Sequence, residues 1–206
     1  MLNFARWYDF IFEGVLKTLR KNAAILAPLQ PGLTVLDIGC GTGSQLRYYS
    51  DSECEIYGID LSRPMLGLAK SKLGDQAFLA VGDAIRIPYP AQTFDLVISS
   101  LFIHQLDPAL RSAMMIETSR VAKPGGQILL VDFHQLSRGS IRGSLTFGLI
   151  SLIEFIAGWE HFSNSRDFLA RGGIPPLAIE HQWIIQKSIV VGNGNLGIYL
   201  LGRENR

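Results

Sequence analysis

The feature that most constrains this chain is an apolar run that ends in an acidic residue and three alternating glycines. It extends from Val35 to Gly43 and reads VLDIGCGTG. A chain that turns sharply out of a strand and lets a ligand touch its backbone cannot carry a Cβ at the turn. Gly39, Gly41 and Gly43 occupy those positions. Residues 44–49 are predicted to begin a helix whose N-terminal amides point back at the loop.

A second acidic residue supports a ligand site at this loop, because a glycine-rich loop alone is a weak signal. Asp60 closes the next strand-like run and follows Asp37 by about 20 residues, the spacing at which a carboxylate accepts hydrogen bonds from ribose hydroxyls. Asp60 is therefore the predicted ribose ligand.

The glycine spacing separates two classes of ligand. A nicotinamide or flavin dinucleotide site of the pattern G-x-G-x-x-G would place its third glycine at position 44, which is Ser44 here. Asp37 inside the loop is also an unfavourable neighbour for a pyrophosphate, whereas it suits a cationic sulfonium and an ammonium. The sequence disfavours the dinucleotide alternative but leaves it open.

Short apolar runs alternate with helical or loop segments along the chain, a pattern that predicts a parallel α/β sheet. After the first run they lie at residues 55–59, 77–81, 94–99 and 127–132. Two later runs, 183–191 and 196–201, are joined by Gly-Asn-Gly-Asn and predict a hairpin. Ligands bind at the carboxyl ends of such strands. One edge of the sheet should therefore carry Asp37, Asp60, Asp83, Ser99 and Asp132.

The successive motifs resemble those of the class I S-adenosylmethionine-dependent methyltransferases. They are Val35 to Gly43, Ile59-Asp60, Val81 to Ala84, Phe94 to Val97, and Lys123 to Gly126. The resemblance covers roughly Leu33 to Asp132 and is greatest to the branch that includes the ubiquinone and menaquinone C-methyltransferases. It implies S-adenosylmethionine as cofactor. It also implies a Rossmann-like three-layer sandwich, with a seven-stranded, mostly parallel sheet and an antiparallel C-terminal strand slotted into it.

The resemblance also implies a set of cofactor-binding residues. Asp83 and the amide of Ala84 would read the adenine edge, and Ser99 would lie near the reacting methyl group. Tyr8 would belong to an N-terminal helix that closes over the cofactor, or would only anchor that helix. Cys40 is interpreted as packing beside the ligand. The full predicted set is Tyr8, Asp37, Gly39, Cys40, Gly41, Gly43, Asp60, Leu61, Asp83, Ala84 and Ser99.

Methyl transfer from a sulfonium depends mainly on holding the acceptor and the methyl group close and aligned. A hydroxyl or acidic-carbon acceptor also needs a base, and His104, just beyond the fourth run, is the best-placed candidate. A histidine that only shapes the pocket is the alternative. His134 and His161 rank lower.

The chain is predicted to form one methyltransferase domain with four segments. Residues 1–30 are an amphipathic helical lead, 31–134 the cofactor-binding core, 135–180 a variable lid or acceptor segment, and 181–206 the terminal hairpin. Within the lid, the apolar run 145–157 is interrupted by Glu154 and is too short to span a membrane, though it could contact one. A buried packing helix explains it equally well. Beyond it, Ser163 or Asn164 is a candidate helix cap, in a stretch that could instead be an acceptor-recognition loop.

The charge balance and the cysteine and histidine content limit the classes of partner and ligand that are expected. The 19 basic and 18 acidic residues give a net charge of +1 without a basic run, so nucleic acid is not expected as a substrate. Two cysteines, one inside the ligand loop, and no secretory signal favour a cytoplasmic location. No metal site is predicted, because the histidines are widely separated and neither cysteine has a partner at metal-binding spacing.

The acceptor is expected to be small and apolar or lipid-like, with a quinone precursor or other phenol favoured. Carbon, oxygen and nitrogen acceptors all stay open, as does the oligomeric state. A protein that keeps the cofactor fold as a non-catalytic regulatory module is the third functional alternative.

Overall fold

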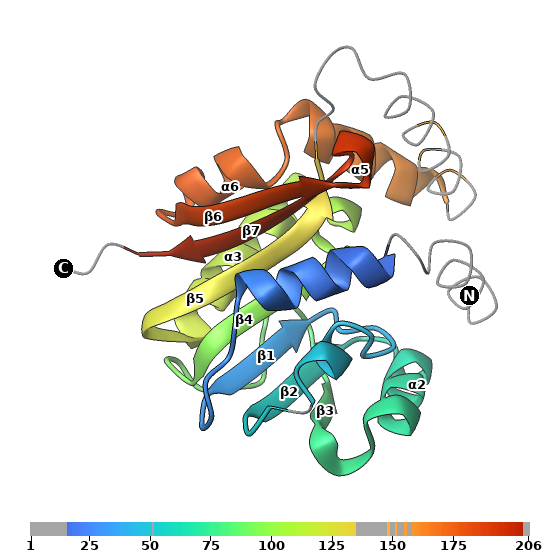
Figure 1. Cartoon of the computed structure of the whole chain (residues 1–206). Coiled ribbons are helices and arrows are strands. Elements are labelled where there is room, and N and C mark those ends of the chain that lie inside the picture. The colour runs from blue at the N-terminus through green and yellow to red at the C-terminus, as the bar shows by residue number, and fades with distance from the viewer. Residues whose placement is uncertain are drawn as a thin grey trace.

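The computed structural model describes residues 16–50, 52–134, 148, 151, 155 and 158–203. Its centre is a seven-stranded sheet in the order β3-β2-β1-β4-β5-β7-β6 (Figure 1). The strands are β1 (Thr34–Ile38), β2 (Glu55–Asp60), β3 (Phe78–Val81), β4 (Phe94–Ser100), β5 (Ala122–Phe133), β6 (Ile184–Val191) and β7 (Leu196–Gly202). β7 lies between β5 and β6 and runs antiparallel to both, whereas the other neighbouring strands of the described sheet pair in parallel. The predicted Rossmann-like sheet, with an antiparallel C-terminal strand slotted into it, is confirmed.

Helices cover both faces of the sheet. The described helices are one at residues 16–26, α2 (Arg63–Leu73), α3 (Pro108–Val121), α5 (Trp159–Ala170) and α6 (Ile174–Glu180). Four short 3-10 turns are η1 (Leu46–Tyr48), η2 (Gly74–Gln76), η3 (Ile103–Gln105) and η4 (Gly192–Gly194). Helix 16–26 crosses in front of the middle of the sheet, and α3 lies behind it (Figure 1). The predicted N-terminal helix is thus present in its described part and ends before Pro28.

The local sequence explains where these elements lie and begin. The central strand β1 is buried along almost its whole length, as expected for a strand covered on both faces. At the start of α3, the Asp107 carboxylate accepts a hydrogen bond from the Leu110 amide at 2.9 Å, and Pro108 occupies the first turn. Turn η4 joins β6 to β7, so the predicted terminal hairpin is also confirmed.

Strand β5 begins at Ala122 rather than at the predicted residue 127, because the Lys-Pro-Gly-Gly stretch is held inside an irregular strand start. Ala122 pairs with Phe94, and the register then shifts before regular pairing resumes. The Lys123 ammonium lies 2.7 Å from the Asp95 carboxylate, which also accepts from the amide and hydroxyl of Thr34. Burial alone would raise the pKa of Asp95, but these donors lower it. The network ties β1, β4 and β5 together at their amino-terminal edge.

Arg111 fastens α5 to α3. Its side chain is buried, and its guanidinium donates to the Asp167 carboxylate at 2.7 Å and to the Asn164 carbonyl at 2.6 Å. The same guanidinium lies over the Phe168 ring, 5.1 Å from its centroid. Asp167 also binds the exposed Arg171. The buried Arg111 guanidinium therefore contacts polar and aromatic groups along a full turn of α5.

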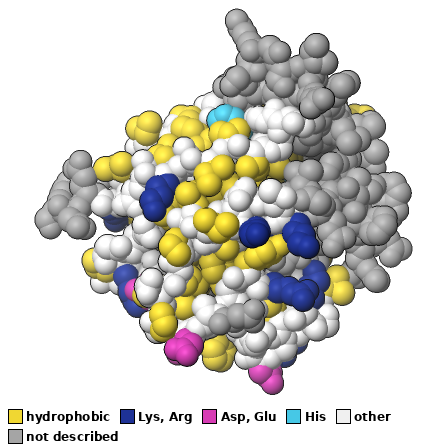
Figure 2. All heavy atoms as spheres, viewed as in Figure 1, with side chains coloured by type: hydrophobic (Ala, Val, Ile, Leu, Met, Phe, Trp, Pro, Cys, Tyr) yellow, Lys and Arg dark blue, Asp and Glu magenta, His cyan; other side chains and the backbone are white. Residues whose placement is uncertain are grey.

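No helix in the described part of the chain is long and apolar enough to cross a membrane. On the face drawn in Figure 2, hydrophobic side chains spread across the middle, and basic side chains stand at separate places among them.

Replacing Arg111 by methionine should destabilise the fold, because it removes the buried donors from α5 while keeping most of the side-chain volume. We expect the free energy of unfolding to fall by about 2–4 kcal/mol in urea titrations. Arg171→Met is the matched control, because it removes the exposed partner of the same Asp167 carboxylate. It should cost less than about 1 kcal/mol, and equal losses in the two variants would contradict the assigned role of Arg111.

Candidate cofactor and acceptor site

The parallel strands bring the predicted acidic and polar residues to one edge of the sheet. Asp37 lies near the carboxyl end of β1, Asp60 ends β2, and Asp83 follows β3. Ser99 and Asp132 lie near the carboxyl ends of the next two strands, β4 and β5. The site therefore draws on five strands that are adjacent in the sheet.

The three loop glycines all have positive φ angles, between 53° and 70°. Two of them are also needed for packing. A Cβ on Gly39 would lie 2.6 Å from the Phe102 ring, and one on Gly43 would lie 2.8 Å from Leu73 of α2. A Cβ on Gly41 would meet no described residue within 4 Å. Gly41 is thus the open position of the loop, where a ligand can approach the backbone.

The predicted helix after the loop is wrong. Residues 44–49 contain only the single 3-10 turn η1. The Ser50 hydroxyl donates to the Arg47 carbonyl at 2.9 Å, and the Ser52 hydroxyl donates to the Tyr49 carbonyl. Side-chain hydroxyls thus take carbonyls that a continuing helix would use, so no extended helix points its amides at the ligand loop.

Asp60, the predicted ribose ligand, also holds the glycine loop of residues 39–43 in place. One carboxylate oxygen accepts from the Gly41 amide at 2.9 Å, and the other accepts from the Ser62 amide at 2.8 Å. Asp60 is half-buried, and a carboxylate oxygen can accept more than one hydrogen bond. These contacts leave capacity for ribose hydroxyls. Leu61 beside it is 67% exposed, so it is available to contact a ligand.

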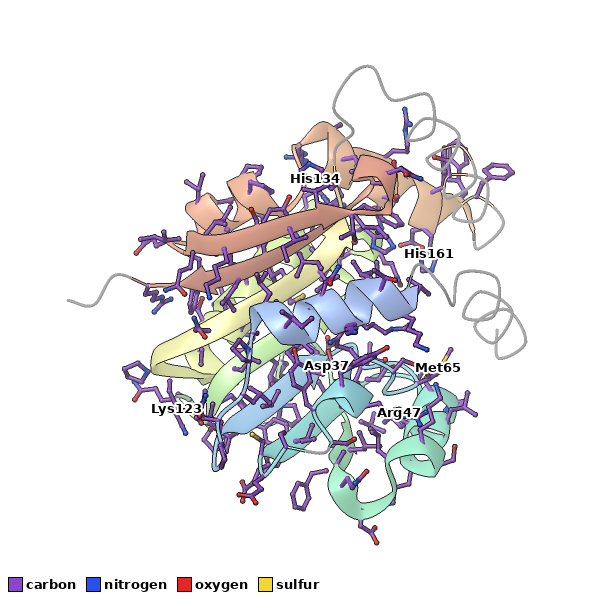
Figure 3. All side chains as sticks on the ribbon, viewed as in Figure 1. Asp37, Arg47, Met65, Lys123, His134 and His161 are labelled. Carbon is purple, nitrogen blue, oxygen red and sulfur yellow. The ribbon has the colours of Figure 1, made fainter. Side chains whose placement is uncertain are left out.

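Asp37 is almost completely buried, and this burial dominates its electrostatics (Figure 3). Burial raises the pKa of the carboxyl well above its usual range, and the nearby Asp60 raises it further. Arg20, on helix 16–26, acts in the opposite direction. Arg20 was not predicted as a site residue, because nothing in its local sequence links it to a strand end beyond its place on a predicted helix.

Two buried polar atoms at this edge, Asp37 Oδ1 and Ser99 Oγ, have no hydrogen-bond partner among the described residues. Such groups are rare in native proteins and call for a missing partner. An ammonium group would satisfy Asp37, so the amino-acid end of S-adenosylmethionine fits here.

Burial, followed by the charges of Asp37 and Asp60, raises the pKa of the Cys40 thiol. Cys40 is therefore suited to packing rather than to nucleophilic chemistry.

Asp83 and Ala84 follow β3 in a tight turn. The Asp83 carboxylate accepts from the Ile85 amide at 3.1 Å, and Asp83 also forms a β-bridge with Arg86. Ala84 is buried while Asp83 is half-buried. The Asp83 carboxylate orders this turn through its own hydrogen bond. The turn in turn holds the carboxylate beside the ends of β2 and β3.

His104 is buried in η3 and pairs with Asp132 of β5. Its Nδ1 lies 2.5 Å from Asp132 Oδ1, and its backbone amide donates to Asp132 Oδ2 at 3.1 Å. The imidazole stacks on the Phe133 ring, with 4.1 Å between centroids. Sequence analysis placed Asp132 on the site edge but did not connect it to His104, because 28 residues separate the two.

The other candidate histidines lie elsewhere. His134 Nδ1 lies 2.6 Å from the Tyr199 hydroxyl, and burial lowers the His134 pKa. His161 lies in the first turns of α5, and Figure 3 shows it apart from His134. A small hollow beside the end of β5 is lined by Phe133, His134, Ser151, Phe162, Ser165, Arg166, Leu169 and Asn195. It adjoins His104 through Phe133.

Two further predictions concern the lid. The cap interpretation of Ser163 and Asn164 is wrong, as is the loop alternative, because α5 begins at Trp159 and both residues lie inside it. Asn164 instead donates to the Gln105 carbonyl at 2.8 Å and so links α5 to η3. Tyr8 lies outside the described residues, as does most of the apolar run 145–157.

Comparison with known proteins identifies the family. Residues 36–130 match the sequence family described as "Methyltransferase domain". Demethylmenaquinone methyltransferase of Renibacterium salmoninarum is 32% identical over 149 residues, which cover 72% of this chain and 62% of that protein. Residues 36–130 form a methyltransferase domain of the class I S-adenosylmethionine-dependent type.

Other similarities support the same family and fold. Malonyl-[acyl-carrier protein] O-methyltransferase of Salmonella typhimurium is 34% identical over 148 residues, covering 72% of this chain and 51% of that protein. The solved S-adenosylmethionine-dependent methyltransferase of Aquifex aeolicus has a TM-score of 0.61 at 21% identity, covering 92% of this chain and 88% of that one, and shares the fold. The chain spans 51% and 62% of the length of the first two curated relatives.

Replacing Asp37 by asparagine should stabilise the ligand-free protein while weakening cofactor binding. The native carboxyl has a raised pKa, so its burial opposes folding increasingly as pH rises above the unfolded value of about 3.9. We expect the free energy of unfolding at pH 8 to rise by about 1–3 kcal/mol, the typical cost of an unsatisfied buried polar group. The gain should shrink toward pH 4 in urea titrations. A pH-independent gain, or a loss at pH 8, would contradict this account of Asp37.

Proposed function

We propose that this protein transfers a methyl group from S-adenosylmethionine to a small, apolar or lipid-like acceptor by in-line displacement. The observation that carries the proposal is the buried Asp37 oxygen, which has no partner among the described residues, together with the open backbone position at Gly41 in the same loop. A buried anion without a partner favours a cationic ligand over a pyrophosphate. The match of residues 36–130 to a methyltransferase domain supports the same reading.

Each end of the cofactor has residues suited to hold it. Asp37 would accept from the ammonium, and Arg20 is the cation near Asp37 that suits the α-carboxylate. Asp60 would accept from the ribose hydroxyls while it keeps the Gly41 amide in place. Asp83 and the Ala84 amide would contact the adenine edge. Gly39, Cys40, Gly43 and Leu61 would shape the rest of the cradle, together with Ser99 and Tyr8.

S-adenosylmethionine supplies a methyl group on a positively charged sulfur that is already a good leaving group. The protein's contribution is then to align the acceptor with that methyl group and to exclude water. Where the acceptor must lose a proton, His104 is the proposed general base. Its turn follows Phe102, whose ring packs on Gly39 of the ligand loop, so the base and the cofactor loop are neighbours.

Both the fold and the relatives' names support the acceptor class. The hollow beside β5 presents the apolar side chains of Phe133, Phe162 and Leu169. Two relatives are named for demethylmenaquinone and for malonyl-[acyl-carrier protein], which favours a quinone precursor or another lipid-like acceptor. We further propose that the chain is a single methyltransferase domain that acts in the cytoplasm, where its two cysteines, both free in the structure, would stay reduced.

Calorimetric titration of the purified protein with S-adenosylhomocysteine, with NADH as the control ligand, tests the cofactor assignment. We expect S-adenosylhomocysteine alone to bind, with a Kd in the micromolar range, or about −8 kcal/mol. Binding of NADH alone would overturn the assignment. Cofactor binding without turnover across a panel of phenols, carbon acids and amines would instead indicate a non-catalytic binding module.

The ribose contact has its own test. Asp60→Ala removes charge-assisted hydrogen bonds worth about 1.5–3 kcal/mol each and also releases the Gly41 amide. The affinity for S-adenosylhomocysteine should therefore fall at least about tenfold in the same calorimetric titration. Asp75→Ala is the matched control, because that carboxylate is fully exposed and binds only Lys70 among the described residues. Equal affinity in the two variants would show that the ribose lies elsewhere.

A further inference from the structure

The buried pair of His104 and Asp132 points to a more specific acceptor chemistry. We propose that Asp132 positions His104 to remove a proton from the attacking atom of the acceptor, so that the acceptor is a phenol, an enol or an acidic carbon. This inference rests on the proposed methyl transfer and deepens it. His104 would be the catalytic base, and Asp132 would be a positioning residue that acts through it.

The hydrogen bonds around Asp132 determine which nitrogen of His104 can act. The Asp132 carboxylate accepts from the Phe133 amide at 2.7 Å, from the His104 amide at 3.1 Å and faces His104 Nδ1 at 2.5 Å. A carboxylate that accepts from backbone amides also accepts from the ring, so Nδ1 carries the proton. The neutral imidazole then keeps its basic lone pair on Nε2.

The surrounding contacts keep the ring in one orientation. The Phe133 ring stacks on the imidazole on one side, and Asn164 of α5 holds the Gln105 carbonyl next to it in sequence. At the other end of the turn, Phe102 packs on Gly39 of the cofactor loop. His104 thus has two neighbours that reach the proposed site: Phe102 packs on the loop that would hold the cofactor, and Phe133 lines the hollow.

The transfer step balances in atoms and charge. The acceptor oxygen or carbon forms its bond to the methyl carbon as the carbon–sulfur bond breaks, and the electron pair of that bond stays on sulfur. The acceptor proton moves to His104 Nε2 and later passes to water. One positive charge thus leaves sulfur and one appears on the imidazole, where the buried Asp132 carboxylate stabilises it.

This arrangement favours some acceptors over others. A neutral amine attacks through a lone pair that is already free and gains little from a base during the transfer. A phenol, an enol or an acidic carbon becomes a good nucleophile only as its proton is removed. A buried base held by two hydrogen bonds to one carboxylate, from its ring and from its backbone amide, is therefore suited to the second group.

Long-range ¹H–¹⁵N spectra of the four histidines test the assignment in the full chain saturated with S-adenosylhomocysteine. We expect His104 to carry its proton on Nδ1, and its Nε2 resonance to shift when 1,4-dihydroxynaphthalene is added but not with decylamine. His104→Gln assigns the signal, and His134, paired with Tyr199, is the internal control. A proton on Nε2, or no response to the phenolic probe, would overturn the proposal. Failure of S-adenosylhomocysteine to bind would instead refute the proposed cofactor.

Asp132→Asn tests the positioning role, since its oxygen at the Oδ2 position still accepts from the His104 amide. The acceptor at Oδ1, which serves the His104 ring and the Phe133 amide, is lost. The asparagine NH₂ turned toward the ring would favour the tautomer protonated at Nε2. We expect kcat with 1,4-dihydroxynaphthalene to fall about 10²–10⁴-fold, with KM and S-adenosylhomocysteine affinity nearly unchanged. His104→Gln should cause the same loss, and the double variant no more. An unchanged kcat in Asp132→Asn, additive losses, or turnover of decylamine but not of the phenol would overturn the proposal.

Discussion

The burial of the Asp37 carboxylate at the end of β1 is the constraint on which the rest of the site depends. β1 lies between β2 and β4 in the sheet, so the carboxylate cannot move out to solvent without disrupting the centre of the fold. Burial and the charge of Asp60 both oppose its ionisation. The loop glycines then leave backbone space next to it at Gly41. We propose that this rigid carboxyl group, one of whose oxygens has no partner among the described residues, is prepared in advance for a cation that would favour its ionised form.

Sequence reasoning reached the parts of the site that short-range rules control. Asp37, Gly41 and Asp60 follow from one βαβ unit, in which strand ends and glycine spacing determine the geometry. The partnership of His104 with Asp132 does not follow from any local rule, because it depends on how η3 folds back over β5. Arg20 was missed for the same reason. Its charge acts on Asp37 because helix 16–26 crosses in front of the middle of the sheet.

The errors at the level of elements have local physical causes. Residues 44–49 have helical composition, but Ser50 and Ser52 compete for the carbonyls and limit the segment to one turn. The early start of β5 reflects a second role for a family motif. The Lys-Pro-Gly-Gly stretch brings Lys123 to Asp95 at the edge opposite the site. The Lys-Pro-Gly-Gly motif of the family thus helps to hold the strands of the sheet together and does not contribute to the ligand site.

The distribution of charge links these observations. Asp37, Asp60 and Asp132 stand at the carboxyl ends of three strands of one sheet. The partners of Asp60 and Asp132 there are backbone amides and one imidazole, and one Asp37 oxygen has no partner among the described residues. Backbone amides orient a carboxylate but bring no positive charge. The edge therefore keeps a net attraction for cations that the fold itself does not satisfy. In the proposed methyl transfer a positive charge lies first on sulfur and then on the imidazole that takes the acceptor's proton, and the proposed sites of both lie along this edge. The same electrostatic field can thus bind the cofactor and stabilise the proton that the reaction releases.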